Sequence, residues 1–123
     1  MIDTSQIGPG IPVGATVAEY VAKRWGRAVR TVPAATVSVG TTATQLCKNN
    51  PRRFQLMVIN LSNAAAYELF NNQVSATNGF IIAALGGSIT YEAAEDGELV
   101  TYDHWAVNPG GPLPLIVVEV ETI

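Results

Sequence analysis

The sequence has few of the residues that most often carry chemistry. Among its 123 residues there are one cysteine, Cys47, and one histidine, His104. A single cysteine excludes a disulfide within the chain, and a single histidine excludes a metal site built from two histidines. The glycine pairs are not followed by the lysine and hydroxyl residues of a phosphate-binding loop. We therefore expect no bound cofactor or metal.

Charge is also scarce. Only 14% of the residues are charged, against about 25% in an average globular protein. The net charge of −3 disfavours nucleic-acid binding, which usually needs a basic face. No apolar run approaches the roughly 20 residues that span a bilayer, and residues 1–10 do not resemble a signal peptide. With 48% hydrophobic residues, the chain can bury a core, and we expect partners to cover part of its surface.

Residues 1–32 form a segment of their own. Residues 1–12 contain two Pro and two Gly, which predicts an extended arm. Helical spacing of apolar residues predicts a short amphipathic helix over about 15–25. Thr16 and Glu19 fit a capping box at its start, and Gly26 is a suitable stop. The apolar face of this helix needs a surface to pack on, either its own domain or a neighbouring subunit.

We interpret residues 1–32 as an attachment element. They hold four bases and two acids, a net charge of +2, whereas the remainder holds three bases and eight acids, a net charge of −5. The basic segment could dock on the acidic domain of the next copy, or these charges could be ordinary surface charges. The candidate partner-binding residues are Ile7, Pro9, Ile11, Val17, Tyr20, Val21, Arg24, Trp25, Arg27 and Arg30.

Residues 33–123 are predicted to form one β domain. Short apolar stretches recur at regular spacing between clusters of Gly, Pro and Asn, which indicates an antiparallel β-sandwich or small barrel of seven to eight strands. The strongest strand is Arg53 to Leu61, which is apolar on both faces. A strand of that kind is covered on both sides, and in so small a domain another chain could supply one cover.

Three local predictions can be tested directly against a structure. Thr31 to Pro33 is interpreted as a linker, and Glu98 to Tyr102 as part of a strand. The last strand, Leu115 to Glu121, alternates apolar and acidic residues in its second half. For this strand we predict that Ile116, Val118 and Val120 point inward and that Glu119 and Glu121 point outward.

The candidates for catalysis are weak. Cys47 and His104 could meet across a sheet as a nucleophile and a base. The simpler interpretation is a small buried cysteine and a surface histidine in a strand connection, so we expect no enzyme activity. A second cluster could bind calcium, serve as a solvated turn or contact a basic partner. It comprises Glu92, Glu95, Asp96, Glu98 and Asp103.

The β region resembles a known class of proteins. From Asn50 to Thr90 the chain reads NPRR, LMVINLSN, AYELF, VSATNGF and GGSITYE, and it closes with VNPGGPLPLIVVEVE. These segments resemble small β-sandwich virion proteins of tailed bacteriophages. The resemblance extends from about Val37 onward and does not include the N-terminal arm and helix.

The resemblance implies a structural role on a virus particle assembled in the host cytoplasm. We expect a capsid decoration (cement) protein that binds the major capsid protein or other virion proteins as a homo-oligomer, with a trimer among the candidate states. The alternatives are a neck or tail adaptor, a head fibre, or a β-sandwich module that binds a carbohydrate or receptor. For the last of these, the candidate platform is Tyr91, Tyr102 and Trp105 with the nearby acids.

Overall fold

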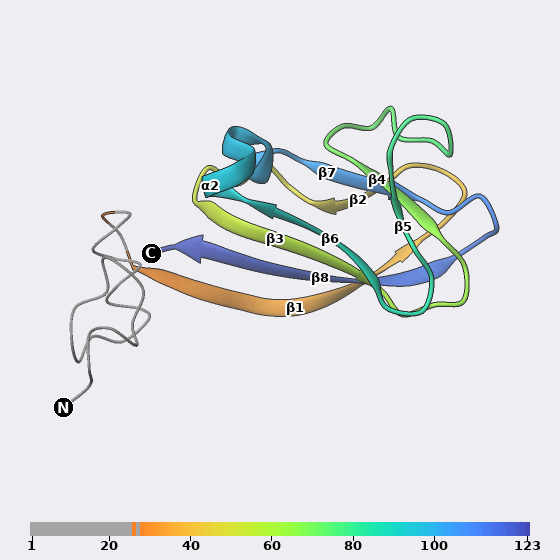
Figure 1. The fold of residues 1–123 in the computed structure, drawn as a ribbon, viewed down its shortest axis with the longest axis horizontal. Helices are drawn as coiled ribbons and strands as arrows, with labels where there is room; N and C mark the ends of the chain where they lie inside the picture. Colours follow the sequence, from red (N-terminus) through yellow and green to blue (C-terminus); the bar gives the residue numbers. More distant parts are fainter. Residues whose placement is uncertain (1–25, 27) are drawn as a thin grey trace, which may run out of the picture.

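The structure is a computed structural model that describes residue 26 and residues 28–123. Figure 1 shows its strands in two layers, with one short helical segment at the end of the sandwich. The elements in chain order are β1 (Val29–Val39), β2 (Thr44–Cys47), β3 (Arg53–Asn60), β4 (Ala66–Leu69), β5 (Phe80–Ile82), β6 (Gly87–Glu92), α2 (Ala93–Asp96), η2 (Gly97–Thr101), β7 (His104–Val107) and β8 (Leu113–Thr122).

The eight strands form two antiparallel sheets of four. One sheet has the order β1-β8-β3-β6 and the other has the order β2-β7-β4-β5. Residues from all eight strands and from η2 meet in one buried cluster between the sheets. The predicted all-β sandwich is thereby confirmed. The predicted helix at about 15–25 and the arm at 1–12 lie outside the described residues.

The first strand begins earlier than the sequence suggests. β1 pairs with β8 from Val29↔Thr122 to Val39↔Leu113, with one irregularity between Val32 and Ala35. The interpretation of Thr31 to Pro33 as a linker is therefore wrong. Pro33 lies where the register shifts on an edge strand, a place where its missing N–H costs no ladder bond.

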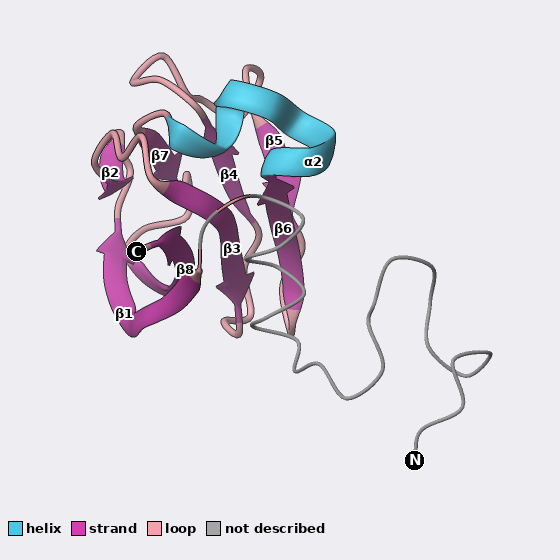
Figure 2. Ribbon diagram, turned by 90° about the vertical axis from the view of Figure 1, so that its left-hand side faces the viewer, coloured by secondary structure: helices cyan, strands magenta, loops and turns pink. Residues whose placement is uncertain are grey.

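The segment after β6 is helical. Ala93–Asp96 form α2 and Gly97–Thr101 form the 3-10 helix η2, so the predicted strand over Glu98 to Tyr102 is wrong. Val100 is the one buried residue of η2 and packs in the core between the sheets. This short helical cap closes one end of the sandwich, as Figure 2 shows.

The last strand also faces the opposite way from the prediction. Leu113, Leu115 and Val117 are buried, whereas Ile116 and Val118 are only half-buried. Leu115 and Val117 pair with inward-facing residues of β1 and β3, so the odd-numbered row of β8 points into the sandwich. Glu119 and Glu121 continue that inner row, and Ile116, Val118 and Val120 point outward.

The two acids of the inner row are neutralised where the sandwich ends. Arg53 is almost completely buried, and its Nε donates to Glu119 Oε1 at 2.7 Å. The same guanidinium donates to the carbonyl oxygens of Lys48, Val100 and Tyr102 at 2.6–3.1 Å. Arg53 thus ties β3 to β8, to the turn after β2 and to η2, which explains why a carboxylate can occupy the inner row.

Candidate functional site

The structure tests few of the predicted attachment residues. Of the ten candidates, only Arg30 lies within the described residues, in β1. Its guanidinium donates to Glu121 Oε1 from Nε at 3.0 Å and from Nη2 at 2.8 Å. Asn50 Nδ2 donates to the other carboxylate oxygen at 3.0 Å. Arg30 therefore joins β1 to β8 of its own chain, and a role in contacting a partner stays a prediction.

These contacts stabilise the charged form of Glu121. The hydrogen bond from Asn50 and the hydrogen bonds from Arg30 lower the pKa of Glu121 below its ordinary value of 4.5. Arg52 adds a more distant contact, with its Nη2 at 3.8 Å from Glu121 Oε1. This cluster lies beside the chain terminus, where the amide of Ile123 donates to the carbonyl of Ala28 at 2.9 Å.

A second polar cluster lies wholly inside the sandwich. Glu68 of β4 and His104 of β7 are fully buried, and Tyr91 of β6 is 5% exposed. His104 Nδ1 lies 2.5 Å from Glu68 Oε1, and the Tyr91 hydroxyl donates to Glu68 Oε2 at 2.6 Å. The Tyr91 and His104 rings also pack together, with centroids 4.6 Å apart. The interpretation of His104 as a surface residue is therefore wrong.

Every polar atom of this buried trio has a partner. His104 Nε2 lies 2.8 Å from the carbonyl oxygen of Leu99, which can only accept, so this nitrogen carries a hydrogen. A short hydrogen bond joins His104 Nδ1 to Glu68 Oε1. Burial, followed by the hydrogen bond to Glu68, raises the pKa of Tyr91 far above its ordinary value. No buried side-chain N or O atom of the described residues lacks a hydrogen-bond partner.

The trio does not form a nucleophile–base pair with Cys47. Cys47 and His104 are partners across the β2–β7 ladder, as the sequence suggested. Both imidazole nitrogens, however, are engaged by Glu68 and Leu99, so neither is available to deprotonate the thiol. Burial raises the pKa of the Cys47 thiol to about 11, which keeps it protonated at neutral pH. This arrangement stabilises the core and does not pair the Cys47 thiol with His104 as its base.

The acidic segment is spread over the helical cap. Asp96 Oδ2 accepts the backbone N–H of Glu92 at 2.8 Å, and Gln45 Nε2 donates to Asp103 Oδ2 at 3.3 Å. Glu95 and Glu98 are exposed. Within the described part of the chain, no three His, Cys, Asp or Glu side chains are placed to share a metal ion.

The outer side of the β1-β8-β3-β6 sheet has an apolar centre. The register places Met57 of β3 beside Val118 of β8, and Ile59 beside Ile116. All four side chains are half-buried, and small hydroxyl residues of β1 and β6 flank them. We call this surface the outer face and define it by Met57, Ile59, Ile116, Val118 and Val120. It is the second apolar side of β3 that the sequence predicted.

Further large apolar side chains are exposed at the sandwich edge. Leu61 and Ile81 are each 61% exposed, Leu85 is 80% exposed and Phe80 is 49% exposed. Phe80 and Ile81 belong to β5, an edge strand of its sheet. Leu85 has a positive φ of 61°, which is unusual for a residue other than glycine. Exposed apolar groups on an edge strand favour contact with another chain.

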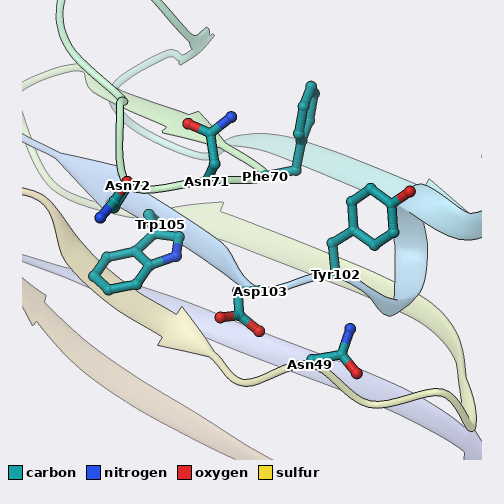
Figure 3. A pocket seen from close by; sticks show the side chains of 7 residues that line it. All are labelled: Asn49, Phe70, Asn71, Asn72, Tyr102, Asp103 and Trp105. Carbon is teal, nitrogen blue, oxygen red and sulfur yellow. The ribbon is translucent and has the colours of Figure 1, made fainter.

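An open pocket of about 340 Å³ lies on the other sheet. Figure 3 shows its lining, which comes from three chain segments that meet near the start of β7. The lining combines three aromatic rings with four side chains bearing amides or a carboxylate. Its residues are Asn49, Phe70, Asn71, Asn72, Tyr102, Asp103 and Trp105.

Two of the aromatic side chains of the pocket pack on a small apolar cluster. Trp105 and Phe70 pack against a small apolar cluster of Leu69, Val74 and Val107 on this side of the sheet. The Phe70 and Tyr102 rings meet edge to face, with centroids 6.4 Å apart. These contacts hold the aromatic side chains of the pocket in place without a ligand.

The structure brings together two of the three aromatic residues of the predicted platform. Tyr102 and Trp105 line one pocket together with Asp103, one of the nearby acids. Tyr91 does not belong to it, because its ring is buried in the core beside His104. Phe70 and the three asparagines of the pocket were not predicted, because they lie in connecting segments far from Tyr102 and Trp105 in the sequence. The Asn71-Asn72 pair directly after an aromatic residue is the local signal that could have drawn attention to them.

Comparison with protein-family models, with curated proteins and with solved structures finds no match to this chain. Among the described residues, no helix is both long and apolar enough to cross a membrane.

Proposed function

We propose that this chain is a non-enzymatic structural protein of a virus particle, and specifically a capsid decoration (cement) protein. The observation that carries the proposal is the outer face, an apolar surface on the two central strands of a rigid sheet. In the single chain these apolar side chains are only half-buried, whereas a protein that binds a shell or its own copies can bury them completely. The resemblance of the β region to small virion proteins supports the same role.

The proposed mechanism separates a rigid body from an attachment element. The sandwich is fixed by its core and by Arg53, which joins four segments through hydrogen bonds and an ion pair. Residues 1–25 precede the body at the end where Ala28 and Ile123 are hydrogen-bonded. The body would sit over a junction between capsid subunits while residues 1–25 contact a neighbour. Added contacts of this kind would oppose the outward pressure of packaged DNA.

The partners would be the major capsid protein or other virion proteins, together with further copies of this chain. A head fibre and a neck or tail adaptor remain alternatives within the same class. The number of copies per purified particle, measured by quantitative mass spectrometry, separates them. A number comparable to that of the major capsid protein supports decoration of the shell. A few copies per particle would contradict it and favour a neck, tail or vertex position.

A truncation tests the attachment element. Because β1 begins at Val29 and Ala28 accepts a hydrogen bond from Ile123, the deletion should end at residue 25. We expect the truncated chain to keep its thermal transition and to lose co-sedimentation with particles that lack the native protein. Undiminished co-sedimentation would contradict the proposed role of residues 1–25.

A charge on the outer face tests the surface itself. Val118→Lys places an ammonium at the centre of the outer face, where the half-buried site lets the long side chain reach water. We expect particle binding or self-association to be lost while the fold is kept. Ala76→Lys, in an exposed loop on the other side of the molecule, is the matched control and should bind as the native chain does. Equal particle binding by both variants would contradict the proposal that the outer face is the binding surface.

A further inference from the structure

We propose that the pocket beside β7 binds a neutral saccharide of one or two sugar rings, held between the rings of Tyr102 and Trp105 and the amides of Asn49, Asn71 and Asn72. This inference goes beyond the structural role and does not depend on it. It rests on a different surface, since the pocket lies on the β2-β7-β4-β5 sheet and the outer face lies on the other sheet.

The size of the pocket sets the size of the ligand. Small-molecule sites usually measure about 300–1,000 Å³. The volume of about 340 Å³ is at the lower end of that range. The pocket therefore accommodates one ring or a disaccharide, and a longer chain would extend past its open side.

The aromatic side chains suit one face of a sugar. A pyranose ring carries a patch of C–H groups on its face and hydroxyl groups around its rim. The face of an aromatic ring has a negative electrostatic potential and attracts polarised C–H groups. Trp105 and Phe70 are half-buried, so their rings are anchored by the cluster beneath while part of each surface stays accessible. Rings held in this way lose little conformational entropy on binding.

The polar side chains suit the rim of a sugar. Each hydroxyl group both donates and accepts, and carboxamides present a donor beside an acceptor. Asn71 Oδ1 accepts the backbone N–H of Gln73 at 2.9 Å, and Asn72 Oδ1 accepts Gln73 Nε2 at 3.2 Å. These bonds orient the two amides and leave both Nδ2 groups without a partner in the described part of the chain. Asn49 makes no side-chain hydrogen bond with any described residue.

The charge of the lining excludes other ligand classes. Asp103 is the one charged side chain among the lining residues, and none of them is Lys or Arg. Phosphate, sulfate and carboxylate ligands are normally bound by cationic donors, which this lining lacks. Gln45 holds one oxygen of Asp103, and the second oxygen has no hydrogen-bond partner among the described residues. A carboxylate with one accepting oxygen is suited to paired sugar hydroxyls.

Fluorescence of Trp105 provides the first test. The chain contains two tryptophans, Trp25 and Trp105, so a full-length Trp25→Phe variant makes Trp105 the sole indole reporter. It would be titrated with glucose, galactose, mannose, N-acetylglucosamine, N-acetylgalactosamine, lactose, cellobiose and chitobiose. We expect a saturable change in emission with at least one of them. A flat response to every sugar would overturn the proposal.

Substitutions then locate the site. In the same background, Asn49→Ala or Asn72→Ala removes an exposed amide and should weaken the responding sugar about tenfold, the effect of one lost hydrogen bond. Asn63→Ala removes an exposed amide in the turn after β3 and should leave the affinity unchanged. Equal affinity in all three variants would place the sugar elsewhere and overturn the proposal.

A cross-check keeps the two proposals distinguishable. Val118→Lys alters the outer face and should leave sugar binding intact. Asn72→Ala, made in the chain that retains Trp25, should leave particle binding intact if the pocket recognises only a saccharide. If Asn72→Ala instead abolished particle binding and no sugar bound, the pocket would be a protein contact and the saccharide proposal would be wrong.

Discussion

Between the two sheets lies a carboxylate that bonds to an imidazole and a phenol, whereas the outer face of one sheet holds five apolar side chains. Glu68 and His104 are fully buried, yet Ile116 and Val118 point away from the core. The interior tolerates its polar groups because each polar atom has a partner. The outer face contains no group that needs a partner for hydrogen bonding, and its stabilisation requires a second surface.

Polarity alone does not determine whether a side chain is buried. A polar side chain can be buried where each of its polar atoms has a hydrogen-bond partner or an opposite charge. A buried charge is tolerated when an opposite charge and hydrogen bonds surround it, whereas an exposed apolar group is common on a protein surface and is stabilised when a partner removes it from water. The two regions therefore serve different purposes: the trio fixes the relative position of β4, β6 and β7, and the outer face is available for contact.

The largest expected effect comes from breaking the buried trio. Glu68→Ala removes the acceptor of the Tyr91 hydroxyl and the partner of His104 Nδ1 and leaves a cavity, so we expect a loss of about 3–5 kcal/mol in the free energy of unfolding. Glu68→Gln is the matched control. Its amide can donate to His104 Nδ1 while its oxygen accepts from Tyr91, so we expect a loss of about 1 kcal/mol. Chemical denaturation measures both; equal losses would mean that the negative charge itself is required.

A smaller effect separates the two rows of β8. Leu115 is fully buried, so Leu115→Ala should cost about 2–5 kcal/mol through lost transfer energy and a cavity. Its neighbour Ile116 points outward, and Ile116→Ala should cost about 1 kcal/mol in a monomer, because the side chain is only half-buried. Denaturation at low protein concentration keeps self-association from masking the difference. If Ile116→Ala cost more stability than Leu115→Ala, the result would support the sequence-based prediction that Ile116 points inward.

Much of the sandwich follows from local patterns. The clusters of Gly, Pro and Asn predict where the strands of the domain are separated, and the apolar stretches between them supply the buried core. The alternation of β8 was misleading, because both of its rows are apolar in the first half. Glu119 and Glu121 suggested an exposed row, yet they are matched by Arg53, Arg30 and Asn50, which are 66–91 residues away in sequence. No local pattern reveals that match.

The sites were harder to predict for the same reason. Glu68, Tyr91 and His104 come from three strands. Glu68 is 23 residues from Tyr91 and 36 residues from His104 in the sequence. A lone histidine between an aspartate and a tryptophan resembles a surface position unless its carboxylate partner is known. The pocket likewise combines residues from three separate chain segments, each with its own local signal. Sequence patterns predicted the strands except for the start of β1 and the helical segment around Glu98 to Tyr102, and the pairing of polar groups across strands had to come from the structure.

The smallest effect concerns the acids that continue the inner row of β8. The hydrogen bonds from Asn50 and Arg30 lower the pKa of Glu121 in the folded state, so the unfolded chain takes up the proton first as the pH falls. The stability that Glu121 contributes is therefore present above its ordinary pKa of 4.5 and is lost as the pH falls through the lower folded value. We expect Glu121→Gln to have a lower thermal midpoint at neutral pH and a flatter decline below about pH 5. Glu95→Gln, which removes an exposed carboxylate without hydrogen bonds to the described residues, should retain the native pH profile. If the Glu121→Gln profile were as steep as that of the native chain, the acid sensitivity would come from other carboxylates and the inner row would be anchored by Arg53 alone.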